Sequence, residues 1–295
     1  VNESHKFETE TTQLPQKLIA LSDIEGNFNG FESFLKSNKV IDNNYNWIYG
    51  DGHLVLVGDF VDRGENVTQV LWLIYKLEQQ AKLNKGKVHF ILGNHEIMNF
   101  QGKWNYNNRK YCKSSQEISG LKDWDKATKF MYSNSTELGR WLRTKNVIEK
   151  IGEYIFVHAG LSPEILEYKL TLSEINKITS KYWDNDLYNN PEDDDVANFL
   201  IGRKSPIWYR GLAIDYKYYN KIIEIELERV LNYYNSKKIV IGHTVVDDIS
   251  TDFNGRVIKI DLKHGKTKQN GKTRGLLIEN GIEYKVDDLG NKEKI

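Results

Sequence analysis

The sequence predicts an α/β fold with a ligand site at one edge of its sheets, and three observations support this prediction. Five short apolar runs look like buried strands, stretches of helical spacing lie between them, and each run leads into a block containing Asp, Glu, Asn or His. In open α/β sheets, ligands bind in the crevice beyond the carboxyl ends of the strands. The runs are residues 18–21, 54–57, 88–92, 154–157 and 239–241.

The blocks that follow these runs are rich in residue types that bind metal ions. They occupy residues 23–27, 58–64, 93–96, 158–160 and 242–244. Carboxylate, amide and imidazole donors gathered in one crevice suit divalent ions such as Mn, Fe, Zn or Mg. The pattern therefore predicts a metal site, and the number of donors favours two ions.

The remaining elements follow from local periodicity. Apolar residues at helical spacing predict helices after the first and second blocks, and residues 146–151 and 154–157 indicate a hairpin. Further helices are expected over residues 136–142, from Ser162, over residues 172–183 and over residues 214–234. Short apolar runs at residues 257–262, 275–278 and 282–286 predict an antiparallel meander at the end of the chain.

The domain organisation is predicted from the absence of linkers and internal repeats. We expect one domain over residues 17–295, with insertions at about 100–145 and 164–205 that cap the crevice. Residues 1–16 are polar and are predicted to be a disordered tether. The chain starts with Val1, which leaves open whether a leader preceded it.

Composition excludes several classes of protein. Among 295 residues, Lys plus Arg and Asp plus Glu both total 41, and this balance argues against bulk electrostatic binding to nucleic acid or anionic membrane. Cys112 is the single cysteine, so an internal disulfide and a thiolate-bound zinc are both excluded. No apolar run approaches the ~18 residues of a membrane span. We expect a soluble protein, either cytoplasmic or exported.

The blocks and their order resemble the calcineurin-like metallophosphoesterases. Residues 58–64 read GDFVDRG and residues 93–96 read GNHE, about 35 residues apart. Each block alone is usually a surface turn or a capped helix start, but their fixed order makes the resemblance specific. Residues 242–245 read GHTV and lack a second His, which favours the phosphoprotein phosphatase branch. Residues 205–211 read SPIWYRG and are similar to the bacterial Shewanella-like protein phosphatases.

The resemblance implies a β-sandwich of two mixed sheets flanked by helices, with two divalent ions, Mn being favoured. It places Asp23 and Asp59 at the first ion, with Asp59 shared. Glu25 stands where the family usually has His, and as a third carboxylate it would shift the first site toward Mn, Mg or Ca. The ligands implied for the second ion are Asp59, Asn94, His158 and His243.

The same resemblance implies roles in hydrolysis of a phosphate monoester by a metal-bridging hydroxide. His95 would protonate the leaving oxygen, and Asp62 would hold the other ring nitrogen. Arg63 and Arg210 would clamp the phosphate oxygens, helped by Asn94.

The substrate expected is a protein phosphorylated on Ser, Thr or Tyr. Two alternatives stay open: a small-molecule phosphohydrolase, such as a diadenosine polyphosphate hydrolase, and a metal-binding protein without activity. Retention of the acid and both clamps argues against the latter. His264, after a late strand, is a further candidate beside the simpler interpretation of a packed loop residue.

Overall fold

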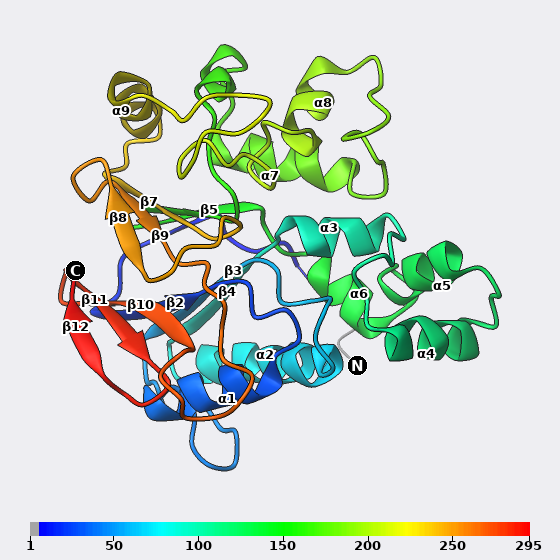
Figure 1. Cartoon of the computed structure of the whole chain (residues 1–295), viewed down its shortest axis with the longest axis horizontal. Helices are drawn as coiled ribbons and strands as arrows, with labels where there is room; N and C mark the ends of the chain where they lie inside the picture. Colours follow the sequence, from blue (N-terminus) through cyan, green and yellow to red (C-terminus); the bar gives the residue numbers. More distant parts are fainter. Residues whose placement is uncertain (1–5) are drawn as a thin grey trace.

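Two six-stranded mixed sheets pack face to face in the computed structural model, which describes residues 6–295 (Figure 1). The first sheet has the order β12-β11-β10-β2-β3-β4, and the second has the order β1-β5-β6-β7-β9-β8. This arrangement confirms the predicted sandwich. The strands of the first sheet are β2 (Lys17–Leu21), β3 (His53–Val57), β4 (Lys87–Ile91), β10 (Arg274–Glu279), β11 (Ile282–Asp287) and β12 (Lys292–Lys294). Those of the second are β1 (Thr11–Thr12), β5 (Ile148–Ile151), β6 (Tyr154–Val157), β7 (Lys238–Ile241), β8 (Ser250–Asp252) and β9 (Val257–Lys259).

The central strands are apolar on both faces because each sheet is covered on both sides. In β2, Leu18 and Ala20 belong to the core between the sheets, whereas Ile19 and Leu21 belong to the larger core under the helices. Since side chains alternate along a strand, one uninterrupted apolar run serves both layers. The strands β2, β3 and β4 run parallel to one another, and so do β6, β7 and β9. The carboxyl ends of these two groups of strands lie at the same edge of the sandwich.

Helices cover the outer faces of the sandwich (Figure 1). The helices α1 and α2 lie below the first sheet, α7 to α9 lie beyond the second, and α4 to α6 form a group at one side. Their bounds are α1 (Phe28–Ser37), α2 (Val67–Leu83), α3 (Asn94–Phe100), α4 (Arg109–Ser119), α5 (Trp124–Met131), α6 (Glu137–Leu142), the 3-10 helix η1 (Pro163–Glu167), α7 (Leu172–Lys181), α8 (Asp195–Ile201) and α9 (Glu224–Tyr233). The two predicted insertions supply α4 to α6, and η1, α7 and α8.

The polar segment before β2 corrects the prediction of a disordered tether in its described part. Thr11 and Thr12 pair in parallel with β5, and the Glu8 carboxylate lies 3.0 Å from Lys145 Nζ. An unpaired edge strand presents free backbone donors and acceptors, so even a polar segment is held there by main-chain hydrogen bonds. Residues 1–5 lie outside the described residues.

Two predicted elements near the carboxyl terminus are also corrected. The expected meander is wrong for its first strand, because β9 pairs in parallel with β7 in the second sheet; of the three expected strands, β10 and β11 are the two that pair with each other. The expected helix over residues 214–234 begins only at Glu224. Asp215 Oδ1 accepts a hydrogen bond from Lys221 N at 2.8 Å, which closes a loop in place of the first helical turns.

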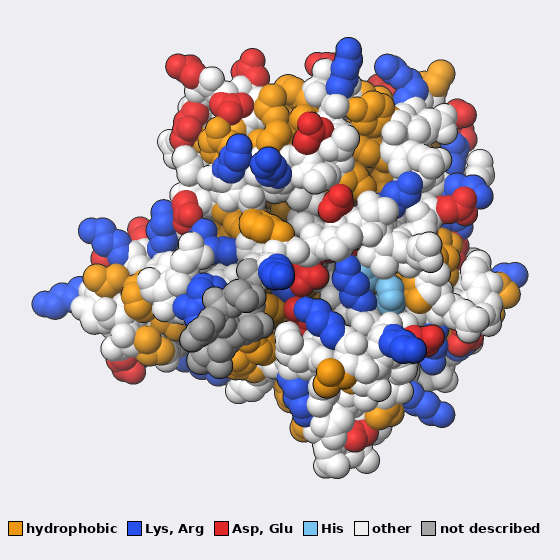
Figure 2. Space-filling model, turned by 180° about the vertical axis from the view of Figure 1, so that it is seen from behind, with side chains coloured by type: hydrophobic (Ala, Val, Ile, Leu, Met, Phe, Trp, Pro, Cys, Tyr) orange, Lys and Arg blue, Asp and Glu red, His pale blue; other side chains and the backbone are white. Residues whose placement is uncertain are grey.

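The surface agrees with the balanced composition. Figure 2 shows acidic and basic side chains interspersed over the face seen from behind. Within residues 6–295, none of the helices combines the length and the apolar character that crossing a membrane requires.

Candidate active site

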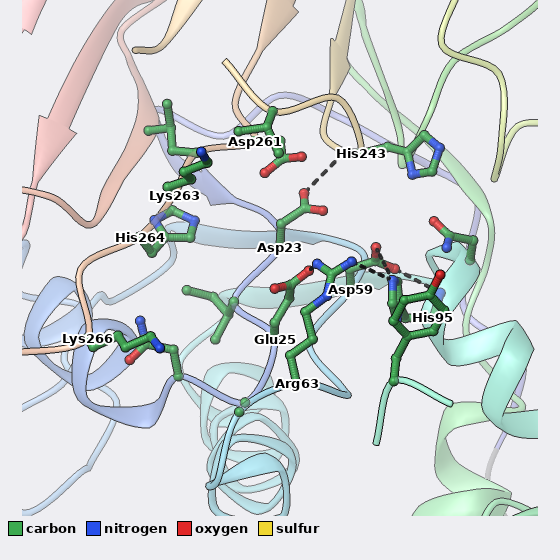
Figure 3. A pocket seen from close by; sticks show the side chains of 18 of the residues that line it. Asp23, Glu25, Asp59, Arg63, His95, His243, Asp261, Lys263, His264 and Lys266 are labelled. Atoms are coloured by element: carbon green, nitrogen blue, oxygen red, sulfur yellow. Dashed lines mark hydrogen bonds and ion pairs between the residues drawn. The ribbon is translucent and has the colours of Figure 1, made fainter. Parts of the chain in front are cut away.

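The carboxyl ends of both sheets meet at a cleft of about 840 Å³. The first sheet contributes Asp23, Asp59 and Asn94 to its wall, and the second contributes His243 and Asp261. Figure 3 shows Asp23 and Asp59 facing His243 and Asp261 across the cleft. His158 is completely buried directly behind this wall. The insertion at 100–145 adds Tyr106 and Asn108, but no residue of 164–205 lines the cleft.

Asp59 lies at the centre of the polar groups. Its Oδ1 accepts a hydrogen bond from His95 N at 3.0 Å, and its Oδ2 lies 3.2 Å from His158 Nε2. Burial raises the pKa of Asp59, but His158 and His95 outweigh it and hold the pKa well below its usual range. The Asp59 carboxylate is therefore ionised, and it belongs to both groups of residues that could hold a cation.

The imidazoles behind Asp59 form the first group of residues that fits a metal ion. Asp59, His158 and His243 place ligand atoms within 4.8 Å of one another. His158 Nδ1 donates to the Val57 carbonyl at 2.9 Å, which directs Nε2 toward Asn94 Oδ1 at 3.0 Å. His243 Nε2 is buried and has no hydrogen-bond partner within residues 6–295. A divalent cation would satisfy these converging donors, so the residues present fit such an ion.

A second group lies on the other side of Asp59. Glu25, Asp59 and His95 also place ligand atoms within 4.8 Å of one another, and Asp23 lies beside them. Asp23 Oδ2 accepts a hydrogen bond from His243 N at 3.2 Å. Burial and the neighbouring Asp261 raise the pKa of Asp23 well above its usual value, because several carboxylates share one wall. This excess of negative charge also favours a cation.

His95 is held with one ring nitrogen fixed and the other at the cleft. Its Nδ1 donates to Asp62 Oδ2 at 2.6 Å, and Asp62 Oδ1 accepts from Asn99 Nδ2 at 2.9 Å. Burial lowers the pKa of His95, but Asp59 and Asp62 together raise it to about 9. The imidazolium is thus favoured, with Nε2 available to donate a proton toward the cleft.

The two arginines differ in how they are anchored. Arg63 is half-exposed, forms an ion pair with Glu25 and lies over the Tyr106 ring at 5.6 Å. Arg210 donates to the His243 carbonyl and, at 3.3 Å, to Thr244 Oγ1. Both guanidinium groups line the cleft, so an anion at its centre meets two forked donors.

Glu96 organises the loops that carry these ligands, although the sequence analysis assigned it no role. Its carboxylate accepts hydrogen bonds from the backbone N–H groups of Asp59 at 2.9 Å, Phe60 at 2.8 Å and Gly93 at 2.8 Å. It thereby ties the second block to the third. Gly93 is required there, since a Cβ atom would overlap the Asp59 carboxylate.

The backbone around the site adopts a conformation that is uncommon for residues other than glycine. Six predicted site residues have φ between 48° and 68°, in the left-handed region that side chains disfavour. These residues are Asp23, Glu25, Asp59, Asp62, Arg63 and His243. These residues follow β2, β3 and β7, where tight turns bring Asp23, Asp59 and His243 to the cleft.

The structure brings all the predicted site residues to this cleft or directly behind it. His264 also lines the cleft, where its Nε2 donates to the Ser22 carbonyl at 2.8 Å. Beyond Glu96, the residues at this site to which the sequence analysis gave no role include Asn99, Tyr106, Trp208 and Asp261. For Asn99 the sequence offered no separate signal, because its position depends on contacts between distant segments. Asp261 belongs to the segment after a late strand, from which the sequence analysis took only His264 as a candidate.

Comparisons with known proteins agree with this geometry. The family described as calcineurin-like phosphoesterase matches residues 16–247. Shewanella-like protein phosphatase 1 of Plasmodium berghei is 30% identical over 228 residues, which cover 77% of this chain and 61% of that protein. Shewanella-like protein phosphatase 2 of Arabidopsis thaliana is 26% identical, with 87% of this chain and 73% of that protein covered. The crystal structure of a cold-active protein-tyrosine phosphatase from a psychrophilic Shewanella species has a TM-score of 0.86 and 34% identity, covering 98% of this chain and 83% of that one.

Proposed function

The chain belongs to the calcineurin-like phosphoesterase family, and from this premise we propose that it is a two-metal phosphatase that acts on phosphorylated proteins. The family implies divalent metal ions, and the cleft contains two groups of residues suited to them. The observation that carries the proposal is the buried Nε2 of His243, which lacks a partner within residues 6–295 beside the ionised Asp59.

The proposed ligands divide around Asp59. Asp23, Glu25 and Asp59 would hold one ion, and Asp59 would share the other with Asn94, His158 and His243. When bound, the two ions would neutralise charge on the phosphoryl group and make water a better nucleophile. Mn is our first choice, because oxygen donors dominate one site and imidazoles enter the other; Fe, Zn and Mg remain alternatives.

The residues of the chain would handle the phosphate and the proton. Arg63 and Arg210 would bind phosphate oxygens with forked donors, and Asn94 would help from the floor of the cleft. His95 would donate the Nε2 proton to the leaving oxygen, while Asp62 keeps the ring oriented through Nδ1. Asn99 supports this pair by holding Asp62.

A phosphoprotein substrate is supported by the cleft and by the relatives. Tyr106 and Trp208 line the cleft beside the polar centre, where an aromatic phosphotyrosine ring would find apolar contact. Two of the proteins reported above are named Shewanella-like protein phosphatases, and the Shewanella structure is named a protein-tyrosine phosphatase.

A second candidate function is hydrolysis of a small polyphosphate, such as a diadenosine polyphosphate. It is favoured by Lys263 and Lys266, which line the edge of the same cleft and form no ion pair within residues 6–295. Additional phosphate groups would be attracted to these cations.

A substrate panel tests both functions. Metal-free protein supplied with Mn would be assayed with an aryl phosphate, with phosphotyrosine, phosphoserine and phosphothreonine peptides, and with diadenosine tetraphosphate. We expect metal-dependent release of phosphate from the aryl phosphate and at least one peptide. Turnover of diadenosine tetraphosphate alone would favour the second function, and no hydrolysis of any substrate with two ions bound would refute both.

A further inference from the structure

Asp261 occupies a position in the cleft that none of the predicted roles explains. It follows β9, and its backbone carbonyl accepts a hydrogen bond from Val246 N at 2.9 Å, which fixes it to the second sheet. Its side chain is 3% exposed and lines the cleft. Figure 3 shows the Asp261 carboxylate pointing toward that of Asp23, which comes from the first sheet.

The Asp261 carboxylate has no hydrogen bond and no ion pair within residues 6–295. Three other buried acidic side chains have such partners: Asp62 has His95 and Asn99, Glu149 has His89 and Asn146, and Glu78 has Lys145 and Trp141. A nearly buried carboxylate that has no partner in the protein and faces a cleft can be compensated only from within that cleft. Side-chain packing does not explain the presence of an aspartate, because an asparagine at position 261 would fill the same space without the charge.

The surroundings of Asp261 show what is missing. Asp261 lines the same cleft as Asp23 and Asp59, and all three side chains are almost completely buried. The guanidinium groups of Arg63 and Arg210 also line this cleft, but Arg63 is already paired with Glu25. Three buried carboxylates, those of Asp23, Asp59 and Asp261, therefore face one space with too little positive charge among the protein's own groups.

Glu25 is poorly placed to be the only additional carboxylate for a cation between Asp23 and Asp261. Its carboxylate is engaged by Arg63, on the side of the cleft away from Asp261. Where the family usually has a neutral imidazole, this chain has a carboxylate already bound to a guanidinium.

We propose that Asp261 is a further carboxylate of the first metal site, where it faces Asp23 and adds negative charge for a hard divalent cation. The inference rests on the proposed two-metal function and deepens it. Because the site then gathers carboxylates and no imidazole, it should prefer Mn or Mg to Zn.

The decisive experiment measures metal binding and not turnover. Asp261→Asn keeps the shape of the side chain and removes the charge. Metal-free wild type and variant would be titrated with Mn by calorimetry, with the number of bound ions counted by elemental analysis. We expect two ions on the wild type, and on the variant a loss of tenfold or more in affinity at one site with the other within twofold. Asp193→Asn, which removes the same charge from an exposed residue away from the cleft, is the matched control and should leave both affinities unchanged.

Thermal unfolding provides a second readout that a purely structural role would not reproduce. Without metal, Asp261→Asn should melt at the same temperature as wild type or higher, because it removes an uncompensated buried charge. With saturating Mn, the gain in melting temperature should be smaller for the variant than for wild type. A variant that melts lower under both conditions, with unchanged Mn affinity, would show that Asp261 is structural and would overturn the proposal.

The outcomes separate this inference from the proposed function. If wild type binds two ions and Asp261→Asn binds them equally well, the inference fails and the function stands. If wild type binds two ions, the variant loses one, and no phosphate ester is hydrolysed, the inference stands and the function fails. Failure of wild type to bind a second ion overturns the inference.

Discussion

Glu96→Gln should destabilise the protein and weaken metal binding together, because one carboxylate holds the loops that carry the ligands. Glu96 Oε2 accepts from Asp59 N at 2.9 Å and Gly93 N at 2.8 Å, while Oε1 accepts from Phe60 N at 2.8 Å and Val61 N at 3.3 Å. A glutamine retains one oxygen, so whichever way it turns, its NH₂ group faces two backbone N–H donors.

The magnitude follows from the two donors left without an acceptor. Each buried donor without a partner costs about 1–3 kcal/mol, so the substitution should lower the free energy of unfolding by about 2–6 kcal/mol. For a chain of this size, 1 kcal/mol corresponds to roughly 2 °C in melting temperature, which gives a decrease of about 4–12 °C. The turn after β3 would also loosen around Asp59, so the affinity for Mn should fall.

The assay is thermal unfolding with and without Mn, together with a Mn titration. Glu153→Gln is the matched control: its carboxylate forms an exposed pair with Lys237, and the change should stay within about 0.5 kcal/mol. A melting temperature of Glu96→Gln within about 1 °C of wild type would refute the reasoning.

Three further substitutions test the proposed roles in the cleft. His95→Asn should lower turnover of an alkyl phosphate about 10²–10⁴-fold with metal content unchanged, and should lower turnover of an aryl phosphate with an acidic phenol by less. An equal loss of turnover for the two substrates would contradict the role of His95 as proton donor. Glu25→His should retain two ions and shift the preference toward Zn, as measured by metal competition, whereas an unchanged preference would remove Glu25 from the ligand set. Arg210→Lys keeps the charge but loses the forked donor, so inhibition by inorganic phosphate should weaken about tenfold at unchanged Mn affinity, and undiminished inhibition would argue against a clamp.

The parts of the fold that local patterns determine were predictable from the sequence. The apolar runs of β2 to β4 and β6 to β7 indicated strands directly, and polar blocks at their carboxyl ends indicated where the cleft would lie. Which strands pair with one another was harder to predict from the sequence. The segment of β9 has the same apolar pattern whether it joins β7 or a meander, because periodicity reports which faces are buried and not which strand is the neighbour.

The same limit explains the site residues that were missed. Glu96 belongs to a recognised block, but its role depends on four backbone N–H groups contributed by two loops. The position of Asp261 in the cleft depends on β9 being in the second sheet. Because the pairing of β9 was predicted wrongly, Asp261 was not recognised as a cleft residue. Ligands directly after predicted strands were found because their placement needs no knowledge of pairing.

The antiparallel pairing of β2 with β10 has a consequence for the protein as it is synthesised. Leu18 pairs with Ile278, so one edge of β2 stays open until β10 has left the ribosome. At about 5–20 residues per second, the 260 positions between these partners take roughly 13–50 s to translate. Asp23 and Asp59 are made early in this interval, whereas His243 and Asp261 are made only near its end. A nascent chain thus exposes an apolar strand edge to chaperones for many seconds, and the cleft can be completed only after His243 and Asp261 have been made.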